Sequence, residues 1–220
     1  MIETGSILLI GMTIGLFGSL VMFASDLLLR FTAEKLVVND DTESYSIVMR
    51  DLPTNRDQLF DTHFSNTLCT VGALFYAVAF AILPLTATTE IGFYLLFVVA
   101  VLLAFALIYS ATHHSYLPHQ SFVSSNTIGS AFAKLISNST SCSRVVLIPL
   151  YVGTIVLALV ILTKQTVFPS WFMLFTPFIT SLIGFIWKYI PLHFSKTILN
   201  GWNQMVFALM FFAMLVWCLS

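Results

Sequence analysis

The chain has 220 residues, of which 58% are apolar and only 9% charged, and its formal net charge is −1. A soluble domain carries roughly 25% charged residues, so this composition excludes a water-soluble fold of this size. The near-neutral charge also gives no electrostatic reason to expect nucleic acid as a partner.

The first apolar segment covers residues 7–31 and is predicted to be a transmembrane helix. A signal peptide is not favoured, because Glu3 stands where a basic residue is needed and the apolar run exceeds the usual h-region. A stripe of small residues (Gly11, Gly15, Gly18 and Ser19) predicts a close contact with another helix.

Asp26 lies near the end of this segment, with Arg30 four residues later. An acid followed by a base at this spacing favours an intrahelical ion pair at the membrane interface. An acid inside a transmembrane segment is also a candidate for a functional site. The alternative hypothesis is therefore a carboxylate that faces a cavity open to the cytoplasm.

The second predicted span covers residues 65–85, and its helix is expected to begin earlier, near Pro53 or Thr54. Asp57, Asp61 and Ser65 then follow one another at intervals of four residues on one helix face. Two carboxylates so placed could hold a divalent ion or share a proton. The simpler interpretation is the solvated start of a helix.

The third predicted span covers residues 91–112 and ends at His113 and His114. Adjacent helical residues project about 100° apart, so one of these histidines is expected to face the bundle. It could relay a proton, bind a metal or donate a structural hydrogen bond. The chain has no HxxxH or HExxH spacing, which favours the structural role and gives no metal site.

The polar stretch 117–143 is predicted to hold an interfacial or re-entrant cytoplasmic helix rather than a further span. One apolar face recurs at three- and four-residue spacing in Ile128, Ala131, Phe132, Leu135 and Ile136.

The last three predicted spans cover residues 145–163, 170–187 and 203–219, with kinks expected at Pro149 and Pro177. Asn200, Asn203 and Gln204 lie at three- and four-residue spacing at the start of the last span. Such amides can bridge helices or line a headgroup pocket.

The predicted fold class is an all-α polytopic membrane bundle, with six transmembrane helices plus the interfacial or re-entrant helix in one domain, residues 1–220. Basic residues are retained on the cytoplasmic side, and all of them except Lys164 fall in or beside loops 32–64, 113–144 and 188–202. Both termini are therefore predicted outside the cytoplasm. Tight turns predict that the second span pairs with the third, and the fourth with the fifth.

Several short motifs are spread over most of the chain. They are Ser25-Asp26, the stretch Met49, Leu52, Pro53 and Arg56, the run from Leu74 to Phe80, the histidine that closes the third span, Pro169 to Pro177, and Asn200 to Asn203. With these motifs the chain resembles an uncharacterised, domain-of-unknown-function family of small bacterial multipass membrane proteins. The chain departs from that pattern in a longer interval from Arg56 to Tyr76 and in few glycines in the second helix. The resemblance implies an architecture of about six helices and no activity.

The leading functional hypothesis is a plasma-membrane protein with a polar, cytoplasm-facing pocket for a lipid headgroup or a small amphipathic ligand. Asp26 with His113 or His114 would handle charge or protons, and Asp61, Asn200 and Asn203 would position the ligand. Two alternatives are an intramembrane enzyme that acts on lipid through Asp and His, and a structural subunit that binds a protein partner through the first cytoplasmic loop. A transporter is less favoured, because the polar residues do not continue across the bilayer. The residues identify no cofactor and no oligomeric state.

Overall fold

The computed structural model describes residues 4–34, 56–124, 139–187 and 195–220, with side chains for 5–28, 63–112, 145–182 and 204–220. These residues are helical apart from turns and an isolated antiparallel bridge between Ala87 and Thr166. The elements in chain order are α1 Thr4–Glu34, α3 Arg56–Ile82, η1 Leu83–Thr86, α4 Glu90–Ser124, α6 Ser139–Leu162, η2 Ser170–Phe175, α7 Pro177–Trp187 and α8 Ser195–Leu219.

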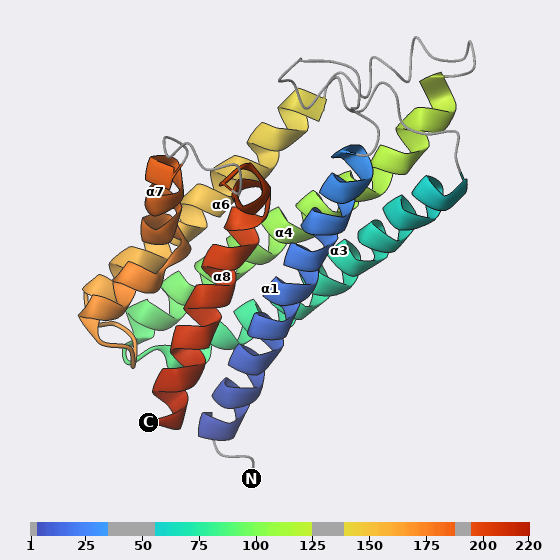
Figure 1. Ribbon diagram of the computed structural model, residues 1–220. Coiled ribbons are helices and arrows are strands. Elements are labelled where there is room, and N and C mark those ends of the chain that lie inside the picture. Colours follow the sequence, from blue (N-terminus) through green and yellow to red (C-terminus); the bar gives the residue numbers. More distant parts are fainter. Residues whose placement is uncertain (1–3, 35–55, 125–138, 188–194) are drawn as a thin grey trace.

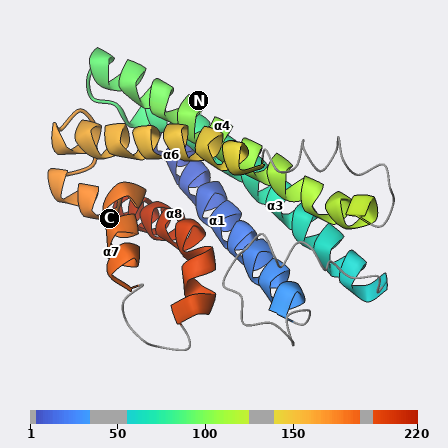
Figure 2. The same cartoon turned by 90° about the horizontal axis from the view of Figure 1, so that it is seen from above.

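Successive long helices run in opposite directions along the bundle, and both termini lie at the same end (Figure 1). We call this the terminal end, and the opposite end, where α1 finishes and α3 begins, the loop end. α1 packs against α3 and α8, α3 packs against α4, and α4 packs against α6. α7 contacts both α6 and α8, so contacts pass around the whole bundle (Figure 2).

Within the described side chains, four helices are long and apolar enough to cross a membrane: Gly5–Leu28, His63–Thr86, Glu90–Thr112 and Val145–Leu162. They coincide with the first four predicted spans, and the described apolar part of α8, Gln204–Leu219, is shorter. Their length and composition support the prediction of an all-helical transmembrane protein. A total of six spans remains a prediction.

The fifth predicted span, residues 170–187, is not one continuous helix. It consists of the 3₁₀ helix η2, an extended residue Thr176 with φ −68° and ψ 148°, and the helix α7 that starts at Pro177. Proline disfavours helical geometry in the residue before it and is well suited to the first position of a helix. Pro177 therefore begins a new helix where a kink was predicted, whereas Pro149 lies inside α6 as expected.

The structure also changes the boundaries around the polar stretch 117–143. α4 continues past the predicted end of the third span to Ser124, and α6 already begins at Ser139. The first part of this stretch thus extends α4. The predicted interfacial face from Ile128 to Ile136 lies outside the described residues.

The small-residue stripe of α1 makes the predicted close helix contact. A Cβ atom added at Gly18 would lie 2.8 Å from Phe75 Cβ and 3.1 Å from the carbonyl oxygen of Gly72 on α3. One turn earlier, a Cβ atom at Gly15 would lie 2.6 Å from the ring of Phe211 on α8. α1 can approach both of its neighbours because these positions carry no side chain.

Aromatic side chains from α3 and α8 fill the middle of the bundle. Tyr76, Phe80, Phe207 and Phe211 are all buried, with the ring centroids of Tyr76 and Phe207 5.4 Å apart and those of Phe80 and Phe211 5.6 Å apart. These distances are typical of favourable aromatic pairs. The aromatic core separates the polar residues near the loop end from the terminal end.

At the terminal end, the two tight turns predicted from the sequence bind each other. The amide of Thr88 donates to the carbonyl of Gln165 at 3.0 Å, and the amide of Val167 donates to the carbonyl of Thr86 at 2.9 Å. We call these paired residues, 86–89 and 164–167, the loop clasp. It joins the α3–α4 hairpin to the segment that follows α6.

Candidate functional site

Asp26 lies near the loop end of α1, inside the contact between α1, α3 and α8. Its carboxyl group is mostly buried and lies next to the side chain of Gln204 on α8. Asp26 also lies close enough to Cys69 and Tyr76 of α3 to interact with both electrostatically. The described surroundings of this carboxyl group therefore come from three helices.

Gln204 connects Asp26 to Tyr76. The Tyr76 hydroxyl donates a hydrogen bond to Gln204 Oε1 at 3.1 Å, and both side chains are buried. With Oε1 used as an acceptor, the amide nitrogen is the atom of Gln204 that can donate to a carboxylate. Tyr76, Gln204 and Asp26, which we call the polar triad, thus lie next to one another, with the Gln204 amide between the other two.

The triad lies next to a pair of serines that locks α1 to α3. Ser25 Oγ donates to the carbonyl of Ser65 at 2.8 Å, and Ser65 Oγ donates to the carbonyl of Ser25 at 2.9 Å. The two Oγ atoms are 3.1 Å apart, and both residues are 1% exposed. This reciprocal contact fixes the rotation of both helices and hence the directions of their next residues, Asp26 and Asn66.

Asn66 is buried, with 7% of its surface exposed, and its Oδ1 atom has no hydrogen-bond partner among the described residues. Its backbone carbonyl accepts a hydrogen bond from Thr70 at 2.9 Å, which leaves the side-chain amide uninvolved in that contact. A buried acceptor without a partner costs about 1–3 kcal/mol. Such a group is uncommon in native proteins and marks a position where a donor would be stabilised.

The arrangement can bind a donor or a positive charge. A carboxylate enclosed by helices attracts a cation more strongly than one in water, because the surrounding dielectric is low. The amide of Gln204 and the hydroxyl of Tyr76 are neutral, so they orient the carboxyl group without neutralising it. Among the side chains described, no three His, Cys, Asp or Glu residues converge as metal ligands would.

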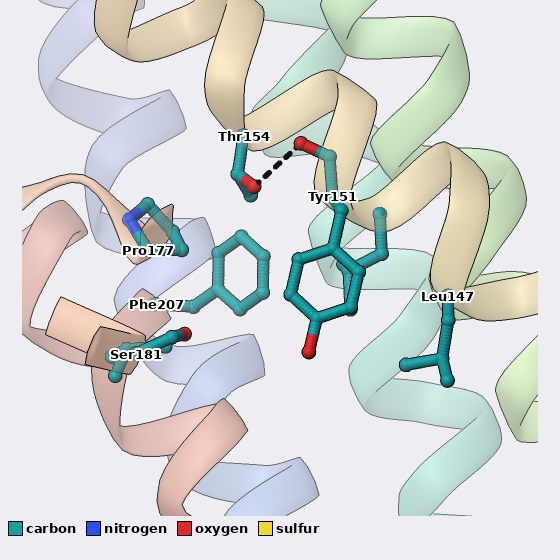
Figure 3. A pocket seen from close by; sticks show the side chains of 8 residues that line it. Leu147, Tyr151, Thr154, Pro177, Ser181 and Phe207 are labelled. Atoms are coloured by element: carbon teal, nitrogen blue, oxygen red, sulfur yellow. Dashed lines mark hydrogen bonds between the residues drawn. The ribbon is translucent and has the colours of Figure 1, made fainter. Parts of the chain in front are cut away.

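A separate small cavity lies between α6, α7 and α8. Tyr151 and Thr154 of α6 face Pro177 and Ser181 of α7 across it, with Phe207 of α8 beside them (Figure 3). Thr154 Oγ1 donates to the carbonyl of Tyr151 at 3.0 Å, as the dashed line shows. The cavity volume of ≈ 20 Å³ is enough for about one water molecule and far below that of a ligand pocket.

The structure places one of the sequence-predicted site residues, Asp26, in the polar triad. Asp61 lies in α3, His113 and His114 lie in α4, and Asn200 and Asn203 lie in α8, but the side chains of all five are outside those described. The same holds for Arg30, the predicted partner of Asp26.

Sequence reasoning missed Tyr76 and Asn66. Tyr76 was visible only as part of an aromatic run, and nothing in the sequence distinguishes its buried hydroxyl from the exposed one of Tyr94. Asn66 carried a usable signal, because an amide next to Ser65 at the start of an apolar span is expensive unless it has a partner.

A comparison with models of protein families identifies the family of this chain. The model of DUF6796, described as a family of unknown function, matches residues 4–220. No curated protein and no solved structure matches the chain. The match confirms the resemblance to a family of unknown function seen in the short motifs, while a bacterial source remains a prediction. Because the match covers nearly the whole chain, this protein belongs to the DUF6796 family.

Proposed function

We propose that this protein binds the headgroup of a membrane lipid, or of a small amphipathic ligand, at the polar triad. The observation that carries the proposal is the Asp26 carboxyl group, held between three helices by an amide that Tyr76 fixes in turn. An ionisable residue inside a transmembrane segment is costly and usually functional. Gln204 and Tyr76 orient the Asp26 carboxyl group but carry no opposite charge, which suits a site that binds a ligand.

The depth of Asp26 and Gln204 supports a headgroup rather than a substrate carried to the middle of the bilayer. Asp26 is five residues from the end of the predicted span 7–31, and Gln204 is the second residue of the predicted span 203–219. At 1.5 Å per residue, both would lie within about one and a half helical turns of the same end of their spans. Lipid headgroups meet the hydrocarbon at this depth.

The proposal includes the orientation derived from the basic residues. The loop end would face the cytoplasm, both termini would lie outside it, and α7 with η2 would complete six crossings of the plasma membrane. The bias of Lys and Arg towards the loop-end segments supports this orientation. The site would then be loaded from the cytoplasmic side or from the inner leaflet.

A structural role in a larger assembly is the second candidate, and the closed aromatic core favours it. Tyr76, Phe80 and Phe211 are fully buried, so the middle of the bundle is packed rather than open. For such a subunit the polar triad would serve only to hold α1, α3 and α8 together. The two candidates differ in what the Asp26 side chain contributes to stability.

The test is the variant Asp26→Asn, studied by native mass spectrometry with phosphatidylethanolamine, phosphatidylcholine and phosphatidylglycerol as probes. We expect one saturable lipid site in the parent protein and a loss of affinity of about tenfold or more in the variant, equivalent to ~1.4 kcal/mol. The melting temperature should stay nearly unchanged, since asparagine can still bond Gln204. The control is Thr13→Val, which removes an exposed hydroxyl bonded to its own helix.

A large drop in melting temperature together with unchanged lipid binding would instead establish the structural role. Absence of any saturable lipid site in the parent protein would overturn the binding function.

A further inference from the structure

The directions of Asp26 and Asn66 follow from the serine pair. α1 and α3 are antiparallel, since Gly11 meets Ile82, Gly18 meets Gly72, and Ser25 meets Ser65. Each residue along a helix turns by 100°, and two antiparallel right-handed helices turn in opposite senses when viewed from one end. The residues that follow a contact pair therefore project to the same side of the two helices.

Asp26 and Asn66 are the residues that follow this pair, so their side chains leave α1 and α3 on one common side. That side faces the interior, because Asp26 reaches Gln204 on α8 and Asn66 is 7% exposed. Packed helix axes lie roughly 8–10 Å apart. Side chains that leave two such helices on one side can lean toward each other, which brings their acceptor atoms within reach of one small donor group at about 3 Å from each.

Asn66 Oδ1 is the independent sign that this position takes a ligand. It is a buried acceptor with no partner among the described residues, whereas the Ser25 and Ser65 hydroxyls beside it each donate to the backbone carbonyl of the other. A ligand that satisfies it must carry a hydrogen-bond donor. A ligand that satisfies Asp26 at the same time must also carry positive charge.

We propose that the site between α1 and α3 binds an ammonium group, with Asp26 supplying the opposite charge and Asn66 Oδ1 accepting an N–H hydrogen bond. This inference rests on the proposed headgroup function and names its ligand class. A primary ammonium has three N–H donors on one compact centre. A trimethylammonium group carries the same charge but no N–H donor, so it leaves Asn66 Oδ1 without a partner.

The ammonium group can come from an aminophospholipid or from a free amphipathic amine. Asn66 is the second residue of the predicted span 65–85, at the same end of the bundle as Asp26 and Gln204. Both sources place their charged group at this depth, with their chains in the hydrocarbon. The test therefore includes one probe for each source.

The first experiment measures binding of phosphatidylethanolamine and of its mono-, di- and trimethylated forms to the full-length parent protein by native mass spectrometry. The charge stays constant along this series while the N–H donors fall from three to none. We expect affinity to fall by about tenfold or more over the series, as for loss of a hydrogen bond between a charged and a neutral group. Dodecylammonium is the probe for a free amine and should compete with phosphatidylethanolamine.

The second experiment repeats the series with Asn66→Leu, which keeps a similar volume and removes the acceptor. The preference for phosphatidylethanolamine over phosphatidylcholine should shrink to within about threefold, while the variant stays folded. The matched control is Thr67→Val, the next residue of α3, whose exposed hydroxyl bonds the backbone of His63 at 3.0 Å. It should keep the parent's preference.

The outcomes separate this inference from the function on which it rests. Equal binding of all four lipids, tightest binding of phosphatidylglycerol, or an unchanged preference in folded Asn66→Leu would each overturn the ammonium site and leave a lipid-binding protein. Binding of dodecylammonium without phosphatidylethanolamine would assign the ligand to the free amines. No saturable binding of any probe would overturn both proposals.

Discussion

Gln204 is the residue on which the polar triad depends, because its amide offers a different atom to each neighbour. Oε1 accepts from the Tyr76 hydroxyl at 3.1 Å, and the other end of the amide meets Asp26. Hydrogen bonds in series polarise one another where water is excluded. Removing the Tyr76 hydroxyl should therefore weaken the interaction between Gln204 and Asp26, and removing the Asp26 carboxyl group should weaken that between Gln204 and Tyr76.

The variant Tyr76→Phe tests the hydrogen bond between the Tyr76 hydroxyl and Gln204. It removes the hydroxyl and leaves Gln204 Oε1 without that donor, at a cost of roughly 1–2 kcal/mol in the free energy of unfolding. Thermal unfolding in detergent should show a lower melting temperature than for Tyr94→Phe, because Tyr94 on α4 is 61% exposed. Equal melting temperatures would show that the Tyr76 hydroxyl does not stabilise the triad.

At the scale of elements, the contact between α1 and α3 positions the whole candidate site. Backbone approach at Gly18 and Gly72 brings the two helices together, and the serine pair fixes their rotation about two turns nearer the loop end. In a membrane such close contacts provide much of the association energy, since lipid is as apolar as the helix surfaces. A change at the glycines should therefore also disturb the site.

The substitution Gly18→Ala should separate the helices. Its new Cβ atom would lie 2.8 Å from Phe75 Cβ and 3.1 Å from the Gly72 carbonyl, so the backbones must move apart. We expect a loss of about 1–3 kcal/mol in unfolding free energy, as for overpacked cores, and weaker lipid binding. The control is Gly5→Ala, where the added atom has no neighbour within 4 Å; a similar loss there would contradict the contact.

At the scale of the whole molecule, the loop clasp closes the terminal end, and the polar residues gather near the other. Ala87 and Thr166 face each other as an antiparallel pair, flanked by the hydrogen bonds from Thr88 to Gln165 and from Val167 to Thr86. Such a pair, not itself hydrogen-bonded, has Cα atoms about 4.5 Å apart. That distance suits a disulfide bond.

The double variant Ala87→Cys and Thr166→Cys, in a background without the native cysteines, tests both the clasp and the proposed orientation. We expect the disulfide to form in cells without added oxidant, because the terminal end would face the oxidising side of the membrane. Gel mobility with and without reductant measures it. A bond that forms only with oxidant in isolated membranes would reverse the orientation, and one that never forms would contradict the clasp.

Much of the helical architecture follows from the sequence alone. Apolar length is a local, additive property, so segments that must satisfy their backbone hydrogen bonds in lipid are recognisable one by one. This is why the first four spans, the tight turns and the small-residue stripe of α1 agree with the structure. The same local reasoning identified Asp26, because an acid in an apolar segment can be recognised without knowing which helices the segment packs against.

The partners of Asp26 depend on the tertiary structure, because they are set by the rotation and depth of three helices at once. Nothing local pairs Tyr76 with Gln204 across 128 positions of sequence, or turns Asn66 to the same side as Asp26. The apolar pattern does not predict the break before α7 either. The same hydropathy fits one helix kinked at Pro177 or a new helix that begins there, and the structure shows the new helix. Hydrophobic length places a helix in the membrane, whereas side-chain contacts between helices decide which polar groups meet there.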